Sequence, residues 1–235
     1  MKTKTTQPHS TKASGNNITI LASPIPATYL VGPAIAEFMT HCPDTRVQLL
    51  TNFWNQSAIE KTEYDLGVFD ISGLGNNTNL ECEELIKSPA KMCCRLAHPL
   101  IQQQNYSTVD VNQYPLALPS NLPQYVNYEL SRLLNRPLIN DQCAAEIYYD
   151  SLLTVRHTLF NSNTIAIAPH IAMTQSLNDQ LKALNPVDWP TIEADFGIVK
   201  HSNKETTEVM NIMMDALFNI ADSIRTESLV KAMSS

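Results

Sequence analysis

Cys143, Asp150 and His157 are the residues whose types and spacing come nearest to a catalytic arrangement. A thiol, an imidazole and a carboxylate can form a relay in which the imidazole activates the thiol as a nucleophile. A chain of 235 residues contains such triples by chance, and the nucleophile-elbow, P-loop and zinc-helix motifs are all absent from the sequence. We therefore predict that the protein is not an enzyme.

The other cysteines and histidines do not have the spacing of a metal or cofactor site. The five cysteines form no Cys-x-x-Cys pair, and their odd number disfavours a disulfide framework and a zinc ribbon. The adjacent Cys93 and Cys94 are compatible with a redox or metal site, but we favour two residues on opposite faces of a strand. Gly73-Leu74-Gly75 lacks the third glycine of a dinucleotide-binding turn. We expect no metal and no cofactor, and reduced thiols fit a cytoplasmic location.

The charge balance and the N-terminus exclude two further classes of protein. The chain has 16 Lys and Arg against 23 Asp and Glu, a formal net charge of −7, which excludes a simple basic nucleic-acid binder. Residues 1–17 are polar, so we predict a disordered lead-in and no signal peptide. No apolar stretch approaches the length of a membrane span, so we expect no membrane partner.

The first third of the ordered chain alternates between strand and helix patterns. Apolar residues at helical spacing predict a helix across Leu30, Ala34, Ile35, Phe38 and Met39, with Pro33 in its first turn and Pro43 after its end. A turn or two of helix is expected at 57–61, and a Gly/Asn-rich loop at 71–79. Three short apolar runs read as strands: 18–22, 47–50 and 66–69. This order is typical of a parallel sheet with crossovers.

A second α/β unit follows, and the chain ends in a long helix. We predict two strands at 83–86 and 92–96, split at Ser88-Pro89, because proline cannot donate to a sheet ladder. Ser202-x-x-Glu205 is a capping-box pattern for a last helix at 206–224, whose methionines we take as core. The remaining predicted elements are strands at 116–118, 165–168 and 196–199 and helices at 125–134 and 152–159.

Seven segments, in order, resemble the effector-binding domain of LysR-type transcriptional regulators. The resemblance covers residues 18–224 and is carried by Ile18–Ser23, Leu30–Phe38, Cys42–Val47, Tyr64–Val68, Ala97-His98-Pro99-Leu100, Tyr114-Pro115-Leu116 and Ile165–Pro169. Two features depart from the family pattern. The stretch between the second and third strands is short, and Asn161–Thr164 replace the family's glycines. The family's DNA-reading winged helix-turn-helix is not found before Ile18.

The resemblance implies an α/β fold of two Rossmann-like lobes, as in type 2 periplasmic binding proteins. The chain would cross between the lobes near residues 88–90 and 190–192. Lobe one would then comprise residues 18–88 plus 191–235, and lobe two residues 89–190. A small molecule would bind in the cleft between them, where strand ends meet helix N-termini.

The strand ends that face this cleft supply the predicted effector-binding residues. Each has an alternative role: Ser23 as a helix cap, Phe69 as core, Ser120 and Asn121 as turn residues, and His170 as a loop residue. Of Tyr148 and Tyr149 at most one can face the cleft, and without an arginine clamp an anionic effector would rely on backbone amides. The predicted site is Ser23, Pro24, Ile25, Phe69, Asp70, Ser120, Asn121, Tyr148, Pro169 and His170.

The function implied is that of a regulatory domain which senses a small molecule to control transcription. In that family, effector binding rearranges an oligomer, so we expect a homodimer in which helix one meets a lobe-two helix of the partner. The apolar face of Ile35, Phe38 and Met39 motivates this pairing. DNA would be bound only through a winged helix-turn-helix that this chain lacks. The alternatives are a free-standing solute-binding protein of the same fold, which the missing signal peptide disfavours, and an enzyme.

Overall fold

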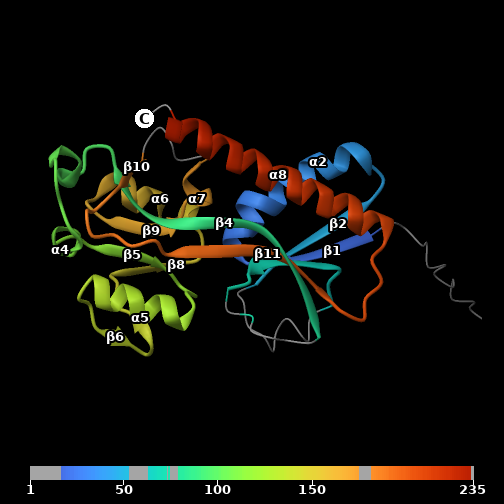
Figure 1. Cartoon of the computed structure of the whole chain (residues 1–235), viewed down its shortest axis with the longest axis horizontal. Coiled ribbons are helices and arrows are strands. Elements are labelled where there is room, and N and C mark those ends of the chain that lie inside the picture. Colours follow the sequence, from blue (N-terminus) through green and yellow to red (C-terminus); the bar gives the residue numbers. More distant parts are fainter. Residues whose placement is uncertain (1–16, 53–62, 73, 75–78, 175–180, 234–235) are drawn as a thin grey trace, which may run out of the picture.

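A computed structural model describes residues 17–52, 63–72, 74, 79–174 and 181–233, with side chains to residue 227 (Figure 1). Residues 1–16 of the predicted lead-in, the helix predicted at 57–61 and most of the loop predicted at 71–79 lie outside the described residues. Asn17, predicted as part of the lead-in, belongs to the first strand.

Lobe one is built on three strands paired in parallel, followed by two strands joined through antiparallel pairing. β1 (Asn17–Ala22) lies between β2 (Arg46–Thr51) and β3 (Leu66–Asp70), and all three run in parallel. β11 (Glu193–His201) pairs antiparallel with β3 and with the first part of β4 (Leu80–Arg95). The strands predicted at 18–22, 47–50, 66–69 and 196–199 are therefore confirmed, the last within a longer strand.

Lobe two continues the same sheet on the other side of β4 (Figure 1). β9 (Ile165–Pro169) pairs antiparallel with the second part of β4 and parallel with β5 (Leu116–Pro119), and β8 (Ile147–Tyr149) pairs parallel with β5. β10 (Leu181–Leu184) also pairs with β4. The strands predicted at 116–118 and 165–168 are confirmed, while the domain boundaries at 88/89 and 190/191 stay a prediction.

The split of β4 at Ser88-Pro89 was a wrong prediction, since one strand of 16 residues runs from lobe one into lobe two. Pro89 lies where β4 exchanges β11 for β9 as its neighbour. The Ala90 N–H donates to Ile192 O, just before β11, at 2.6 Å. The Pro89 carbonyl accepts from the N–H of His170, just after β9, at 2.8 Å. The missing N–H of Pro89 therefore leaves these neighbouring contacts intact.

The first helix is longer than predicted and passes through its proline. α1 (Pro24–Pro26), the π-helical η1 (Ala27–Val31) and α2 (Gly32–His41) follow one another without a break. Pro33 thus lies well inside the helical stretch rather than in its first turn. Proline lacks the N–H for the carbonyl four residues earlier and crowds it. The wider π-turn, closed by the Gly32 N–H on Ala27 O, lies immediately before Pro33 and lets the chain continue as a helix.

The last helix starts later than its predicted capping box. Ser202 and Asn203 form a turn after β11, and α8 (Glu208–Met233) begins only after Thr207, whose hydroxyl accepts from the Met210 N–H at 3.2 Å. The turn is held by Lys204, whose Nζ donates to Tyr64 O and pairs with Asp65 at 2.7 Å. α8 packs on α2, η1 and β4, so it covers lobe one as expected (Figure 1).

The remaining helices and a small hairpin belong to lobe two. The helices predicted at 125–134 and 152–159 are confirmed as α5 (Gln124–Leu133) and α6 (Leu152–Asn161). Short elements that the sequence did not predict are η2 (Pro99–Gln102), α4 (Thr108–Val111), α7 (Ile171–Thr174) and the hairpin strands β6 (Leu138–Ile139) and β7 (Gln142–Cys143).

The buried side chains place the methionines and the cysteine pair in structural roles. Met210 and Met213 of α8 lie in the same buried cluster as Phe38 of α2, which confirms them as core. Cys93 belongs to that cluster, whereas its neighbour Cys94 belongs to a second cluster on the other face of β4. Burial raises the pKa of both thiols to about 12. The interpretation as strand residues on opposite faces is confirmed.

Candidate functional site

A cavity lies where the ends of β1 and β3 in lobe one face the loop after β5 in lobe two. It has two adjoining parts, of about 800 and 100 Å³, which share Ser23, Asp70, Asn121, Leu122 and Pro123. The smaller part is lined further by predicted residues: Pro24, Ile25, Ser120 and Pro169. The structure thus brings seven of the ten predicted residues, which come from both lobes, to one cavity.

Ser23 ends β1 and begins the first helix. Its N–H donates to Val68 O at 3.1 Å and its carbonyl accepts from the Ala27 N–H at 2.9 Å, which fixes the turn. Ser23 takes the N-cap position, as its alternative role expects, but its hydroxyl makes no capping bond and is available to a ligand. Because residues 24 and 26 are prolines, Ile25 carries the one N–H among the first three helical residues.

Asp70, at the end of β3, anchors a polar chain that reaches Tyr125, another residue of the cavity lining. Its Oδ1 accepts from the Ser72 hydroxyl at 2.6 Å and the Ser72 N–H at 3.0 Å. The Tyr125 hydroxyl, from α5 of lobe two, donates to the Ser72 hydroxyl at 3.0 Å. This chain of hydrogen bonds joins the two lobes directly, and sequence reasoning identified only Asp70 in it.

The wall on the side of lobe two is formed by the β5–α5 loop and the β6–β7 hairpin. The Asn127 amide donates to Leu122 O at 3.0 Å and accepts from the Cys143 N–H at 3.0 Å, and Gln142 donates to Ser120 O at 2.9 Å. At the hairpin tip Asn140 and Asp141 have φ of 50° and 62°, a left-handed conformation that Asn and Asp tolerate. Loop and hairpin are therefore fastened into one wall.

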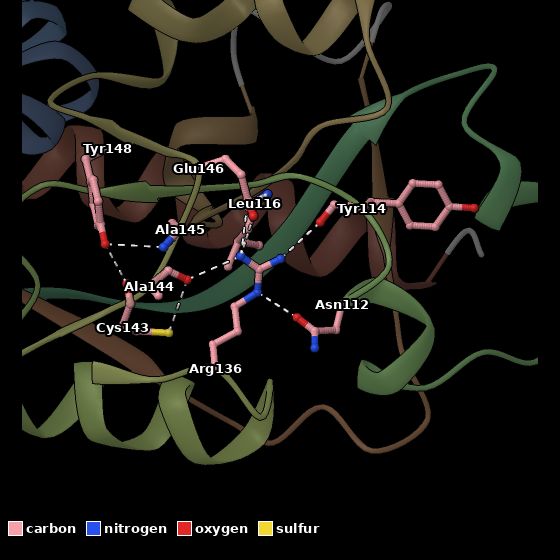
Figure 2. A network of polar contacts seen from close by, with 9 residues as sticks. All are labelled: Asn112, Tyr114, Leu116, Arg136, Cys143, Ala144, Ala145, Glu146 and Tyr148. Atoms are coloured by element: carbon pink, nitrogen blue, oxygen red, sulfur yellow. Dashed lines mark hydrogen bonds and ion pairs between the residues drawn. The ribbon is translucent and has the colours of Figure 1, made fainter. Parts of the chain in front are cut away.

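Arg136 holds this hairpin to the rest of lobe two (Figure 2). Its guanidinium donates to Asn112 Oδ1 at 2.6 Å, Ala144 O at 3.3 Å and Tyr114 O at 3.1 Å, and it pairs with Glu146 at 2.9 Å. The Arg136 side chain is 11% exposed, so these bonds are shielded from water. The planar guanidinium thus fixes both ends of the segment that carries the cavity wall.

We expect Glu146 to contribute to stability in a pH-dependent way. Burial raises the pKa of Glu146, but the hydrogen bonds from the Leu116 N–H and Arg136 outweigh it and hold the pKa below its ordinary value. A lowered pKa in the folded state means that the contribution is present above the ordinary carboxyl pKa and is lost as pH falls through the folded value. Denaturant unfolding from pH 7 to 3 should show the difference between wild type and Glu146→Gln shrinking with acidity. A difference that stays constant over this range contradicts the expectation.

The two adjacent tyrosines point in different directions. The Tyr149 hydroxyl donates to Ile167 O at 2.5 Å, and its buried ring lines the smaller part of the cavity. Tyr148, which we predicted, instead donates to Cys143 O at 2.9 Å and accepts from the Ala145 N–H at 3.2 Å, against the hairpin (Figure 2). Successive residues of a strand face opposite sides of the sheet, so only one of the two tyrosines of β8 can face the cavity. The sequence does not show which of the two it is.

Phe69 and His170 lie outside this cavity. Phe69 is fully buried in a cluster with Leu21 and Val199, which agrees with its alternative role as core. His170 follows β9 and lines a separate cavity of about 480 Å³ beside Pro89 and Ile224. The predicted residues therefore divide into seven at the cavity and three elsewhere: Phe69, Tyr148 and His170.

The imagined cysteine relay is not assembled. Cys143 is fully buried in the hairpin, where burial raises the pKa of its thiol, whereas Asp150 and His157 are exposed. A thiol that resists ionisation in this way is a poor nucleophile. Among the described residues no His, Cys, Asp or Glu side chains gather in a group of three that could bind a metal. No helix in the described part of the chain has the length and apolarity needed to cross a bilayer.

Comparison with known proteins assigns the family. The family model of the LysR substrate binding domain matches residues 12–220. The chain belongs to this family. The SDS degradation transcriptional activation protein of Pseudomonas sp. (strain ATCC 19151) is 28% identical over 155 residues, which are 63% of this chain and 48% of that protein. The chain thus spans about half the length of this relative.

Solved structures of LysR-family domains have the same fold. The effector-binding domain of QuiR, solved in complex with shikimate, matches with a TM-score of 0.65 at 16% identity over 89% of this chain and 99% of that chain. A full-length OxyR variant from Pseudomonas aeruginosa matches with a TM-score of 0.67 at 13% identity over 86% of this chain and 69% of that chain. The predicted fold class, two α/β lobes of the type 2 periplasmic-binding kind, is confirmed by these matches.

Proposed function

We propose that this chain is the effector-sensing domain of a LysR-type transcription regulator and that it binds a small molecule between its lobes. The observation that carries the proposal is the cavity itself, which Ser23 and Asp70 line from lobe one and Asn121 and Tyr125 from lobe two. The family assignment supports a regulatory rather than a catalytic role. Control of transcription belongs to the whole protein, and the match with this chain covers 48% of the relative's length.

The mechanism proposed is a shift between lobe arrangements. We place the boundaries at residues 88/89 and 190/191, so that two backbone crossings join the lobes. A ligand that contacts both walls at once makes more contacts in the closed arrangement than in the open one. It therefore binds the closed arrangement more tightly, and this difference in affinity shifts the population toward closure. The Tyr125–Ser72 hydrogen bond is a contact of this cross-lobe kind that the structure makes without a ligand.

A homodimer remains part of the proposal on the strength of the resemblance. The apolar face of α2 supports it less than the sequence suggested, because Phe38 is fully buried and α8 of the same chain packs on α2. Ile35 and Met39 are half-buried against the same core. A pairing through α2 would therefore use its outer, more polar side.

The proposal is tested first at Ser23. Ser23→Ala should weaken binding of any ligand found by thermal shift by about three- to tenfold, since a neutral hydrogen bond contributes about 0.5–1.5 kcal/mol. The stability of the unliganded domain should not change, because the Ser23 hydroxyl caps nothing. Calorimetric titration measures the affinity, and thermal unfolding the stability.

Ser223→Ala is the matched control, because its hydroxyl lies on the exposed face of α8 and bonds only to Asn219 O within that helix among the described contacts. Both variants remove one hydroxyl from a serine, but only one of these serines lines the cavity. Equal affinities of wild type, Ser23→Ala and Ser223→Ala would remove Ser23 from the site.

A further inference from the structure

The charged side chains that line the cavity are all acidic. They are Asp70 at the end of β3, Asp141 at the hairpin tip and Asp150 after β8. No lysine, arginine or histidine is among the described residues that line either part. The other polar lining groups are hydroxyls and amides, such as Ser23, Asn121 and Gln142, which accept or donate hydrogen bonds without a charge.

These carboxylates have no cationic partner within the described part of the protein. The ion pairs found there use other acids: Glu84, Glu129, Glu146, Glu81, Asp65 and Asp222. Asp70 is held in place by neutral donors on Ser72. Arg136, five residues before Asp141, is not among the lining residues and is engaged by Asn112, Tyr114, Ala144 and Glu146 (Figure 2). Among the residues that the structure describes, no ion pair offsets the negative charge of the cavity.

The backbone of the first helix offsets little of this charge. A helix N-terminus attracts anions through free N–H groups, and the first helix begins at the cavity. Two of its first three residues are prolines, so the N-terminus presents the Ile25 N–H where an ordinary helix presents three. At the first helix an anionic ligand would meet a single N–H beside these carboxylates, so the backbone-mediated anion binding that the sequence suggested loses its support there, although α5 also begins at the cavity with Gln124 and Tyr125 in the lining.

We propose that the effector is a small hydrophilic amine, bound as a cation between Asp70 of lobe one and Asp141 of lobe two. This inference rests on the proposed function, because it names the ligand class of the same cavity. An ammonium group donates charge-assisted hydrogen bonds to carboxylates, which are about twice as strong as neutral ones. Closure excludes water, which strengthens the attraction of a cation and the repulsion of an anion alike. The surrounding hydroxyls and amides suit a ligand that also carries hydroxyl or amide groups.

The test uses nine probes in three charge classes in a low-salt thermal-shift assay. The amines are D-glucosamine, putrescine and L-lysinamide, the neutral compounds D-glucose, myo-inositol and acetamide, and the anions D-gluconate, shikimate and benzoate. We expect the melting temperature to rise with amines and not with anions, because a ligand that binds the folded state stabilises it. Added salt should weaken the effect.

Two conservative variants then locate the binding. Asp70→Asn and Asp141→Asn keep the side-chain shape, and asparagine tolerates the φ of 62° at position 141 as well as aspartate does. Each should weaken amine binding about tenfold or more, since a hydrogen bond to a charged group is worth about a tenfold change or more in affinity. Asp44→Asn, at an exposed position before β2, is the matched control and should leave the affinity unchanged.

Each outcome decides between the ligand class and the function. Amine binding that Asp70→Asn and Asp141→Asn weaken supports both. Anion binding that Ser23→Ala weakens keeps the effector-sensing function and overturns the amine. Amine binding that neither aspartate variant changes also overturns the assignment, because the ligand then lies elsewhere. If no compound of any class shifts the melting temperature, the proposed function fails and the ligand class with it.

Discussion

Replacing Gly197 by alanine should lower the free energy of unfolding by about 1–3 kcal/mol, the usual cost of overpacking a buried site. Gly197 lies in β11 between β3 and β4, in the middle of the sheet of lobe one. A Cβ atom there would lie 2.7 Å from Glu83 O and 2.7 Å from Ile71 Cδ1. The Ile71 side chain can rotate, but the Glu83 carbonyl belongs to a paired strand and cannot move without shifting the sheet.

Gly32→Ala is the matched control. An added Cβ at Gly32 meets Ala27 O at 3.4 Å, which is ordinary contact, and the φ of −56° is helical. Alanine at a helical glycine stabilises by about 0.5–1 kcal/mol, chiefly because the unfolded chain has fewer conformations. Denaturant unfolding of the two variants should therefore give shifts of opposite sign. If Gly197→Ala raises the free energy of unfolding as Gly32→Ala does, the sheet accommodates the added Cβ and the contact with Glu83 carries no cost.

The same region explains why a bulge interrupts the sheet. Phe196 pairs with Ile86 and Gly197 with Glu84, so Leu85 is an extra residue in β4. The Leu85 carbonyl accepts from the Arg225 guanidinium of α8. The bulge thus lies where α8 packs on lobe one. This contact joins residues that are distant in sequence, so no local sequence pattern indicates it.

How much of the fold the sequence predicts depends on whether the signal is local. Strands such as β3 and β9 were predicted because their residues form continuous apolar runs, and the helix of lobe one because Leu30, Ala34 and Phe38 share a face. Pro89 misled the prediction because a strand can cross a proline where its partners change. Whether such a proline breaks a strand is decided by neighbours that are distant in sequence.

The candidate site divides in the same way. Ser23, Asp70 and Asn121 were predicted because they follow strands, and strand ends meet at one edge of a parallel sheet. Tyr125 and the β6–β7 hairpin were missed, although Asn140-Asp141 is a turn signal that would have indicated a hairpin. The prolines at 24 and 26 were visible in the sequence, and their missing N–H groups already argued against an anion at this helix N-terminus.

Arg136→Met should produce the largest loss of stability among these variants, about 2–3 kcal/mol. Methionine keeps the aliphatic stem but removes the guanidinium donors to Tyr114 O, Ala144 O and the Glu146 carboxylate. An unpaired buried acceptor costs about 1–3 kcal/mol, and water that reaches the acceptor reduces this cost. Glu146 is half exposed, which limits the penalty for its lost partner. Arg136→Lys keeps the charge, but its compact ammonium has three N–H donors on one atom and cannot reach all four acceptors of the guanidinium, so it should fall between the wild type and Arg136→Met.

The expected effect of Arg136 reaches beyond stability, because the segment it fastens carries Asn140, Asp141 and Gln142 into the cavity wall. Arg136→Met should therefore also weaken ligand binding at temperatures where the domain is still folded, as measured by calorimetric titration. Arg132→Met, which removes an exposed pair with Glu129 on α5, is the matched control and should change stability by less than about 1 kcal/mol and affinity not at all. If Arg136→Met lowers stability but leaves affinity at the wild-type value, the hairpin keeps its shape without the guanidinium and Arg136 has no part in positioning the wall.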